Sequence, residues 1–235
     1  MLRNATHQWN KILTSKSGLS QLLYCPNFYS DSDTTTLPNP STSLKATNLY
    51  ADLSSHTELK FTSYLIDGIQ IQSPRRMMWC TDSTTIGHYR FSQNHVPGLP
   101  PVPYTPALKQ VVDDVQKELN IAVNAVLINI YDDKKEHSEW HCDDDPWLGS
   151  NFPVASLSLG GEREFCVRPK NNLDDVTSMV LENGSLVVMD GAFQKEMEHS
   201  VPKSSIVVQP RLNLTFRYVE DSLRHLHNSK ARWDS

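Results

Sequence analysis

In the run Pro210-Arg211-Leu212-Asn213-Leu214-Thr215-Phe216-Arg217, polar and apolar residues alternate one by one. Successive side chains of a β-strand point to opposite faces. The run therefore predicts a strand with an apolar face of leucines and phenylalanine and a polar face of arginines, asparagine and threonine. Two interpretations of the polar face remain open. Either it lies inside, where a buried arginine needs an anionic partner, or it faces solvent as in an ordinary surface strand.

Five more short strands are predicted upstream of this run. Gly, Asn or Pro residues separate them, and they cover residues 125–131, 154–159, 164–167, 180–181 and 185–189. Many short strands with Gly and Asn turns favour a β-sandwich or jelly-roll barrel over a doubly wound α/β sheet.

The N-terminal half is less regular. Pro106 suits the first turn of a helix, and apolar residues then recur at helical spacing, namely Leu108, Val111, Val112, Val115 and Leu119. Residues 31–57 are rich in Ser, Thr, Asn and Pro, which predicts a loop or a partly disordered segment. Residues 19–28 form a short apolar element that is either helix or strand.

Length and composition favour one globular domain with additions. The chain has 235 residues, of which 38% are hydrophobic and 21% are charged, as is ordinary for a soluble globular protein. No apolar run approaches the ~20 residues that cross a bilayer, and the N-terminus lacks the features of a secretory signal. We therefore expect an intracellular protein of the nucleus or cytoplasm, with no membrane partner.

The cysteines and charges exclude some classes of site. Four widely spread cysteines form no C-x-x-C pair, which argues against a zinc knuckle and against a disulfide framework. The net charge of −5 does not by itself indicate a nucleic-acid binder. However, residues 60–112 carry five basic and two acidic residues, whereas residues 121–219 carry fifteen acidic and nine basic ones. This asymmetry suits a basic substrate-facing segment over an acidic metal centre.

The strongest candidate for chemistry is the run His141-Cys142-Asp143. In a strand, residues i and i+2 share a face, so His141 and Asp143 can bind one metal while Cys142 points away. His199 would supply a third ligand from a distant strand. Two histidines and one carboxylate leave three positions of an octahedron open, as in non-haem Fe(II) oxygenases. The alternative is a polar surface loop, because an isolated H-x-D is common by chance.

Arg211 follows His199 by twelve residues, inside the alternating strand. If its side chain faces inward, a dicarboxylate co-substrate would supply the anionic partner through a bidentate contact.

Together these motifs resemble the AlkB family of Fe(II)- and 2-oxoglutarate-dependent nucleic-acid dealkylases. Upstream, Pro74-Arg75 and Tyr89-Arg90-Phe91-Ser92 resemble the nucleotide-recognition segment of the family's DNA-repair branch. The resemblance covers residues 74–218, and residues 1–60 lie outside it. Besides the run quoted first, it is carried by Asn129-Ile130-Tyr131, His141-Cys142-Asp143-Asp144-Asp145, Ala155-Ser156-Leu157-Ser158-Leu159-Gly160, Gly184-Ser185-Leu186 and His199-Ser200-Val201-Pro202.

The resemblance implies an α+β fold that is mainly β, with a double-stranded β-helix (jelly-roll) core, flanking helices and a nucleotide-recognition lid. Residues 1–60 would form a partly irregular N-terminal extension, and residues 61–120 the lid and its supporting helix. Residues 121–219 would form the Fe(II)/2-oxoglutarate dioxygenase core, followed by a C-terminal tail at 220–235.

The resemblance also implies roles for individual residues. His141, Asp143 and His199 would bind Fe(II), which in turn binds O2. Arg211 would pair with the distal carboxylate of 2-oxoglutarate, and Arg217 would contact the other end of this co-substrate or the ligand shell. Asp145 would read the damaged base by accepting a hydrogen bond from an exocyclic amine. The residues that would help Arg211 are Asn129, Tyr131 and Asn213.

The implied reaction is oxidative demethylation of N-alkylated bases, such as 1-methyladenine and 3-methylcytosine, in DNA or RNA. It releases formaldehyde and succinate. A methyl group inside a duplex is hard to reach, so the base must be flipped or the strand single. Trp79, Tyr89 and Phe91 are candidates to stack on the base, with core packing as the alternative. Arg75 is a candidate for a phosphate contact, with a solvated surface charge as the alternative.

The choice of substrate stays open at this point. Residues 81–86 lengthen the recognition segment before Tyr89, so DNA or RNA and single or double strand remain undecided. Two other functions are possible from the sequence: a hydroxylase of a protein or small molecule, and a non-catalytic cupin-like binding domain. We expect the protein to be a monomer.

Overall fold

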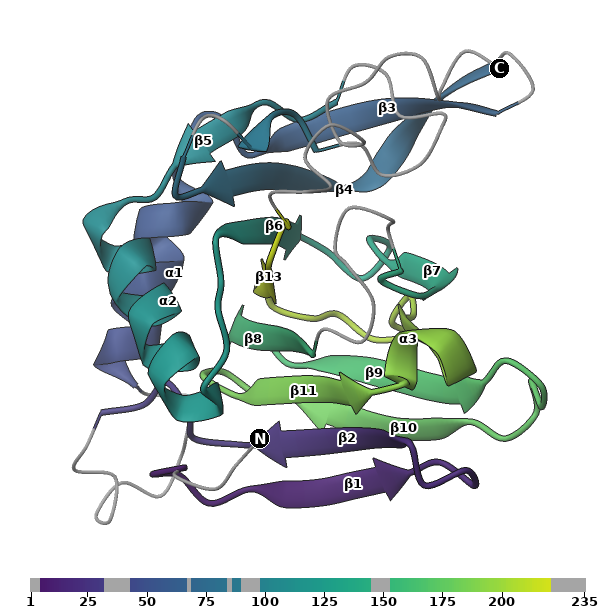
Figure 1. The fold of residues 1–235 in the computed structure, drawn as a ribbon. Helices are drawn as coiled ribbons and strands as arrows, with labels where there is room; N and C mark the ends of the chain where they lie inside the picture. Colours follow the sequence, from purple (N-terminus) through teal and green to yellow (C-terminus); the bar gives the residue numbers. More distant parts are fainter. Residues whose placement is uncertain are drawn as a thin grey trace.

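The computed structural model describes residues 5–31, 43–66, 69–83, 86–89, 98–144 and 153–220. Within these ranges the strands form two sheets (Figure 1). The larger has nine strands in the order β1 (Asn10–Thr14), β2 (Ser20–Cys25), β11 (Leu186–Gly191), β8 (Val154–Gly160), β13 (Arg211–Arg217), β6 (Ala125–Tyr131), β4 (Ile69–Thr81) and β3 (Lys60–Ile66), with β5 (Pro101–Pro103) beside β4. The smaller has four, in the order β10 (Thr177–Leu181), β9 (Arg163–Pro169), β12 (Met197–Val201) and β7 (Ser138–His141).

The two sheets pack against each other through an apolar cluster. Leu22, Val187 and Met189 of the larger sheet meet Phe165 and Val201 of the smaller sheet there. All strand pairs but β4–β5 are antiparallel. The expected mainly β jelly-roll fold with flanking helices is therefore confirmed, and each of the short strands predicted upstream of β13 is present.

Two helices cover the outer face of the larger sheet (Figure 1). They are α1 (Leu44–Ser54) and α2 (Pro106–Leu119). Their apolar faces pack on the outward residues of β6 and β13, among them Ile128, Leu212 and Phe216. The apolar face of β13 therefore points at the helices, and its polar face points between the two sheets.

The local sequence accounts for α2. Thr105 caps its first turn by accepting a hydrogen bond from the Leu108 backbone amide at 3.2 Å, and Pro106 occupies the first position. Asn120 ends it in the left-handed conformation, with a φ of 52°. All five apolar residues predicted for the buried face are buried, so this prediction is confirmed.

The expected loop at residues 31–57 is wrong for its second half. Leu44–Ser54 is helix α1, whose N-terminus is capped by Ser43, and the Asp31 carboxylate also accepts a hydrogen bond from the Leu44 amide at 2.8 Å. Three residues at helical spacing, Ala46, Leu49 and Leu53, are buried against the core. Burial of this narrow apolar stripe outweighs the polar composition.

The N-terminal residues join the larger sheet. The apolar element at residues 19–28 contains strand β2, which pairs with β11 from Leu186↔Cys25 to Gly191↔Ser20. Strand β1 forms the edge beyond it. The segment expected to be an extension thus contributes two strands to the sheet. Within the described part of the chain, no helix is both long and apolar enough to span a membrane.

Glu118, on α2, binds the residues that precede β1. Its carboxylate accepts hydrogen bonds from the Thr6 hydroxyl at 2.7 Å, the Trp9 indole at 3.0 Å and the Thr6 and His7 amides at 3.1 Å. Burial alone would raise the pKa of Glu118, but these hydrogen bonds lower it to about 2. The ionised carboxylate therefore stabilises the fold.

We predict that Glu118→Gln lowers the free energy of unfolding at pH 7 by about 1–3 kcal/mol, because a neutral amide accepts these bonds less strongly. A carboxyl group whose pKa is lowered by folding stabilises the protein fully above its ordinary value of 4.5. This contribution is lost as the pH falls toward about 2. Urea unfolding at several pH values should thus show the variant and wild type converging in acid. Lys117→Gln, at an exposed neighbouring position, is the control; an equal effect there would contradict the prediction.

Candidate functional site

His141 and His199 are brought together by strand pairing. They are direct cross-strand partners in β7 and β12, and their ring centroids lie 4.3 Å apart. Asp143 follows two residues after His141, just beyond the end of β7. Among the described residues, the potential ligand atoms of these three side chains all lie within 4.8 Å of one another. The predicted ligand set therefore converges at one point.

Hydrogen bonds orient these ligands. The Nδ1 atom of His141 lies 2.7 Å from the Glu139 carbonyl oxygen, which can only accept, so Nδ1 carries the proton and Nε2 keeps its lone pair. The Asp143 Oδ1 atom accepts a hydrogen bond from Arg217 Nη2 at 2.6 Å, and its Oδ2 atom lies 3.8 Å from His199 Nε2.

The electrostatics leave the three groups in the protonation states that a divalent metal needs. Burial lowers the pKa of both histidines, that of His199 to about 3. Burial would raise the pKa of Asp143, but Arg217, His199 and His141 together hold it well below its usual range. Two neutral imidazoles and one carboxylate fit an iron ion with open coordination positions.

The polar face of β13 lies inside the protein. Arg211, Asn213, Thr215 and Arg217 are all less than 9% exposed. The strand lies between β8 and β6, so both of its edges are paired. The interpretation of this run as a surface strand is therefore wrong, and the inward-facing arginine is confirmed.

Arg211 is buried without a carboxylate partner in the described residues. Its Nη2 atom donates to Ser158 Oγ at 2.8 Å and to Asn213 Oδ1 at 2.9 Å, while its Nε and Nη1 atoms have no hydrogen-bond partner there. Burial lowers the pKa of Arg211 to about 10, so the guanidinium still carries its charge at neutral pH. Unsatisfied, charged donors on a buried arginine fit the carboxylate of a bound ligand.

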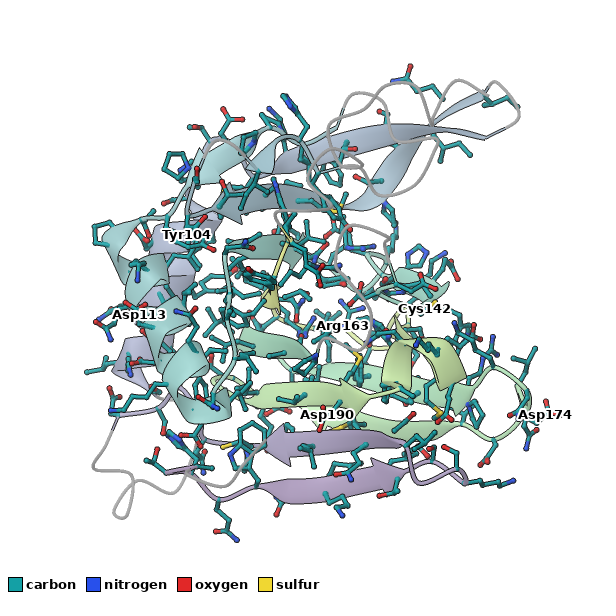
Figure 2. All side chains as sticks on the ribbon, in the orientation of Figure 1. Tyr104, Asp113, Cys142, Arg163, Asp174 and Asp190 are labelled. Atoms are coloured by element: carbon teal, nitrogen blue, oxygen red, sulfur yellow. The ribbon has the colours of Figure 1, made fainter. Side chains whose placement is uncertain are left out.

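Tyr131 lies at the centre of a group of arginines. The guanidinium carbons of Arg163, Arg211 and Arg75 lie 5.3, 5.4 and 5.7 Å from the centre of its ring. Arg75 also donates through Nε to Asn129 Oδ1 at 2.8 Å. In Figure 2, Arg163 is labelled near the middle of the molecule, between the layers.

The ligand triad and the predicted co-substrate residues line one cavity. Asn129, Tyr131, Arg211, Asn213 and Arg217 face it together with His141, Asp143 and His199. The described lining of this cavity contains three arginines, Arg75, Arg211 and Arg217. It contains only one carboxylate, that of Asp143. This excess of positive charge suits an anionic ligand with two carboxylates.

The predicted base-binding aromatics divide into two groups. Trp79 and Tyr89 are buried and pack against each other with ring centroids 4.9 Å apart, and the Trp79 indole donates to the Gly87 carbonyl at 3.2 Å. Their burial favours core packing over stacking on a base. Phe91 and Asp145 lie outside the described residues.

Arg75 differs from its expected role. It is buried in the cavity, donating to Asn129 and to the His137 carbonyl at 3.0 Å, and so does not present its charge to a phosphate on the surface. The neighbouring Arg76 is paired with Asp132, with both hydrogen bonds at 2.8 Å.

Sequence reasoning gave no role to several residues of the site. Ser156 and Ser158 bind the side chains of Asn213 and Arg211, respectively. Their signal was available, since polar residues at a period of two interrupt the apolar strand at 154–159. Arg163 and Gln194 gave no comparable signal, because their contacts join distant parts of the chain.

Comparison with known proteins agrees with this geometry. The family model of the 2OG-Fe(II) oxygenase superfamily matches residues 33–217. The Fe(II) and 2-oxoglutarate in that description correspond to the three ligands and to the unsatisfied donors of Arg211.

The individual relatives are all proteins named as alkB homologues. The chain is 28% identical over 225 residues to alpha-ketoglutarate-dependent dioxygenase alkB homolog 3 of Bos taurus, covering 92% of this chain and 72% of that protein. It is 36% identical over 128 residues to DNA oxidative demethylase ALKBH2 of Bos taurus, covering 52% and 46%. The solved structure of OsALKBH1 superposes with a TM-score of 0.52 at 18% identity, over 83% of this chain and 96% of that one, which supports the fold.

We predict that Asp143→Asn weakens metal binding about 100-fold or more, because the only carboxylate of the described triad loses its charge. Asparagine keeps an oxygen that can accept from Arg217, but the buried arginine loses its charged partner, so circular dichroism first checks that the variant is folded. Binding of Co(II) to the metal-free protein, followed by its visible absorption, measures the effect. Asp190→Asn, on an intermediate-exposure residue at the end of β11, is the control, and unchanged Co(II) affinity in Asp143→Asn would contradict the assigned ligand set.

We further predict that Arg211→Met raises the dissociation constant for 2-oxoglutarate about 10–100-fold, which corresponds to losing charge-assisted hydrogen bonds of about 1.5–3 kcal/mol. Calorimetric titration of the Mn(II)-loaded protein under nitrogen checks it. Mn(II) affinity itself should not change, and equal 2-oxoglutarate affinity in variant and wild type would contradict the role of Arg211.

Proposed function

Since the chain belongs to the AlkB family within the 2OG-Fe(II) oxygenase superfamily, we propose that it removes alkyl groups from the nitrogens of nucleic-acid bases. Its cofactors are Fe(II), 2-oxoglutarate and O2. We propose N-alkylated bases such as 1-methyladenine and 3-methylcytosine, in DNA or RNA, as its substrates. The observation that supports this most is the joint presence of the His141–Asp143–His199 triad and the buried Arg211 in one cavity of a chain similar to a DNA oxidative demethylase.

The residues around the triad would divide the work as follows. His141, Asp143 and His199 would hold Fe(II). Arg211, kept in place by Ser158 and Asn213, would bind the distal carboxylate of 2-oxoglutarate. Asn129 and Tyr131 would support it by holding Arg75 and by filling the space between the arginines.

Arg217 has a different task, because it is hydrogen-bonded to a metal ligand. It fixes the Asp143 carboxylate and keeps it ionised, and it lies at the same cavity as Arg211. From there it would also reach the end of the co-substrate that lies nearest the metal. Together these contacts would orient the co-substrate and exclude water from it.

When bound, Fe(II) and 2-oxoglutarate would supply the hydroxylation of the N-methyl group by O2, with 2-oxoglutarate converted to succinate and CO2. The N–CH2OH group then loses formaldehyde, and the ring nitrogen recovers its original state. The protein's remaining task is to present the base, which must leave a duplex or come from a single strand. We propose that Asp145 accepts from the exocyclic amine and that Phe91 stacks on the base. Trp79 and Tyr89 would contribute through core packing and not by stacking on the base.

We also propose that the protein works as a monomer, in the nucleus or cytoplasm, where its nucleic-acid substrate is found. Light scattering on purified protein should return a mass near 26.7 kDa. A dimer mass at micromolar concentration would contradict the monomer.

Mass spectrometry of oligonucleotides tests the function. Single- and double-stranded DNA and RNA carrying one 1-methyladenine or 3-methylcytosine are incubated with the protein, Fe(II), ascorbate and 2-oxoglutarate. We expect loss of the methyl group on at least one of these substrates, with succinate formed in equal amount, and no reaction with Asp143→Asn.

The other outcomes separate the alternatives. Succinate formed without any loss of methyl would indicate a hydroxylase of another substrate, such as a protein or a small molecule. No succinate from a protein that binds metal would indicate a non-catalytic binding domain. Either result would overturn the proposal.

A further inference from the structure

The geometry points to Gln194 as a positioning residue for the iron ligand Asp143. We propose that the Gln194 side chain holds the backbone of Asp143, so that its carboxylate is set for the metal before the metal binds. This inference concerns the metal centre alone and does not depend on which substrate is oxidised.

A hydrogen bond joins the two residues directly. The backbone amide of Asp143 donates to Gln194 Oε1 at 2.8 Å, across 51 positions of sequence. An amide N–H can only donate, so it determines which end of the Gln194 side chain faces Asp143. The other end, Nε2, then faces the sulfur of Met189 at 3.7 Å. Both the oxygen and the nitrogen of the Gln194 side-chain amide therefore have a partner.

Asp143 needs such support because it lies outside the sheet. Strand β7 ends at His141, and residues 142–144 have no regular structure. His141 and His199 are held by strand pairing, whereas the backbone of Asp143 is not. Arg217 holds the end of its side chain at 2.6 Å, and Gln194 holds its backbone. Gln194 thus fixes the position of the Asp143 backbone, and Arg217 fixes the orientation of its carboxylate.

The helix that carries Gln194 is itself held in place by several contacts. It lies in the short helix α3 (Phe193–Glu196), whose Phe193 is fully buried between the sheets. The side chain of Lys170, which follows the last residue of β9, donates to the Gln194 carbonyl at 2.9 Å, and the Lys170 amide donates to the Glu196 carbonyl at 2.9 Å.

The hairpin formed by β1 and β2 also contacts helix α3. The Glu196 carboxylate accepts hydrogen bonds from the hydroxyls of Ser20 at 2.5 Å and Ser17 at 2.9 Å. Strands β1 and β2 are thereby connected through α3 to the metal ligand. Figure 1 shows α3 above β11 and β2 and below β7.

The expected effect is on metal affinity. Partners that orient a metal ligand typically change metal affinity by about 10–100-fold when they are removed. Gln194→Met keeps the length and packing of the side chain but replaces the amide oxygen by a weak acceptor. Gln194→Glu keeps an oxygen acceptor and adds a negative charge. Lys195→Ala, on the exposed side of the same helix, is the matched control.

Co(II) titration of the metal-free full-length protein, followed by visible absorption, is the experiment. We expect Gln194→Met to raise the Co(II) dissociation constant about tenfold or more and to alter the absorption band. We expect Gln194→Glu to bind at least as tightly as wild type, and Lys195→Ala to be unchanged. Circular dichroism and thermal unfolding should show all three variants folded.

Two results would overturn the inference. One is Gln194→Met binding Co(II) as tightly as wild type with the same spectrum. The other is Gln194→Glu losing affinity to the same extent as Gln194→Met, since an acceptor would then not be what matters. If wild type itself fails to bind Co(II), the ligand set His141–Asp143–His199 is at fault, and this result separates the failure of the site from the failure of the inference.

Discussion

The hydrogen-bonded ion pair between Arg217 and Asp143 joins the two sheets of this protein. Arg217 ends strand β13 of the larger sheet, and Asp143 follows strand β7 of the smaller one. Both side chains are almost fully buried, at 2% and 7% exposure. A buried charge without its partner is strongly destabilising, so this pair constrains how the sheets approach each other. It also keeps the carboxylate ionised beside two neutral histidines, as a metal site requires.

A second constraint follows from the first. With Asp143 taken by Arg217, no carboxylate in the described lining of the cavity remains to neutralise Arg211 and Arg75. The protein satisfies these arginines in part through serine, asparagine and a backbone carbonyl, and it surrounds them with the ring of Tyr131. Such an interior favours a ligand that brings negative charge with it. The co-substrate therefore completes the electrostatics of the fold and takes part in the chemistry.

Individual residues show which parts of the fold and of the site could be predicted from the sequence and which could not. The order of His141, Asp143, His199 and Arg211 was readable because each is a residue type with a narrow range of chemistry. Helix α1 was missed because its apolar stripe is only three residues wide within a polar segment. Trp79 and Tyr89 were candidates for base stacking by residue type. The structure places both in the core, because β4 is paired on both sides and its Trp79 packs with Tyr89 in one buried apolar cluster.

The sequence by itself determined the local geometry: the alternation that makes β13 a two-faced strand, the spacing that makes α2 a helix, and the types of the metal ligands. The strand and helix patterns repeat every two or 3.6 residues, so the identity of neighbouring residues is enough to predict them. Only the tertiary structure decided which face of β13 is inside, that three arginines gather around Tyr131, and that Gln194 supports Asp143. The contacts of Asp143 alone span 51 positions of sequence to Gln194 and 74 to Arg217. They depend on the register of strands that meet only when the two sheets close on each other.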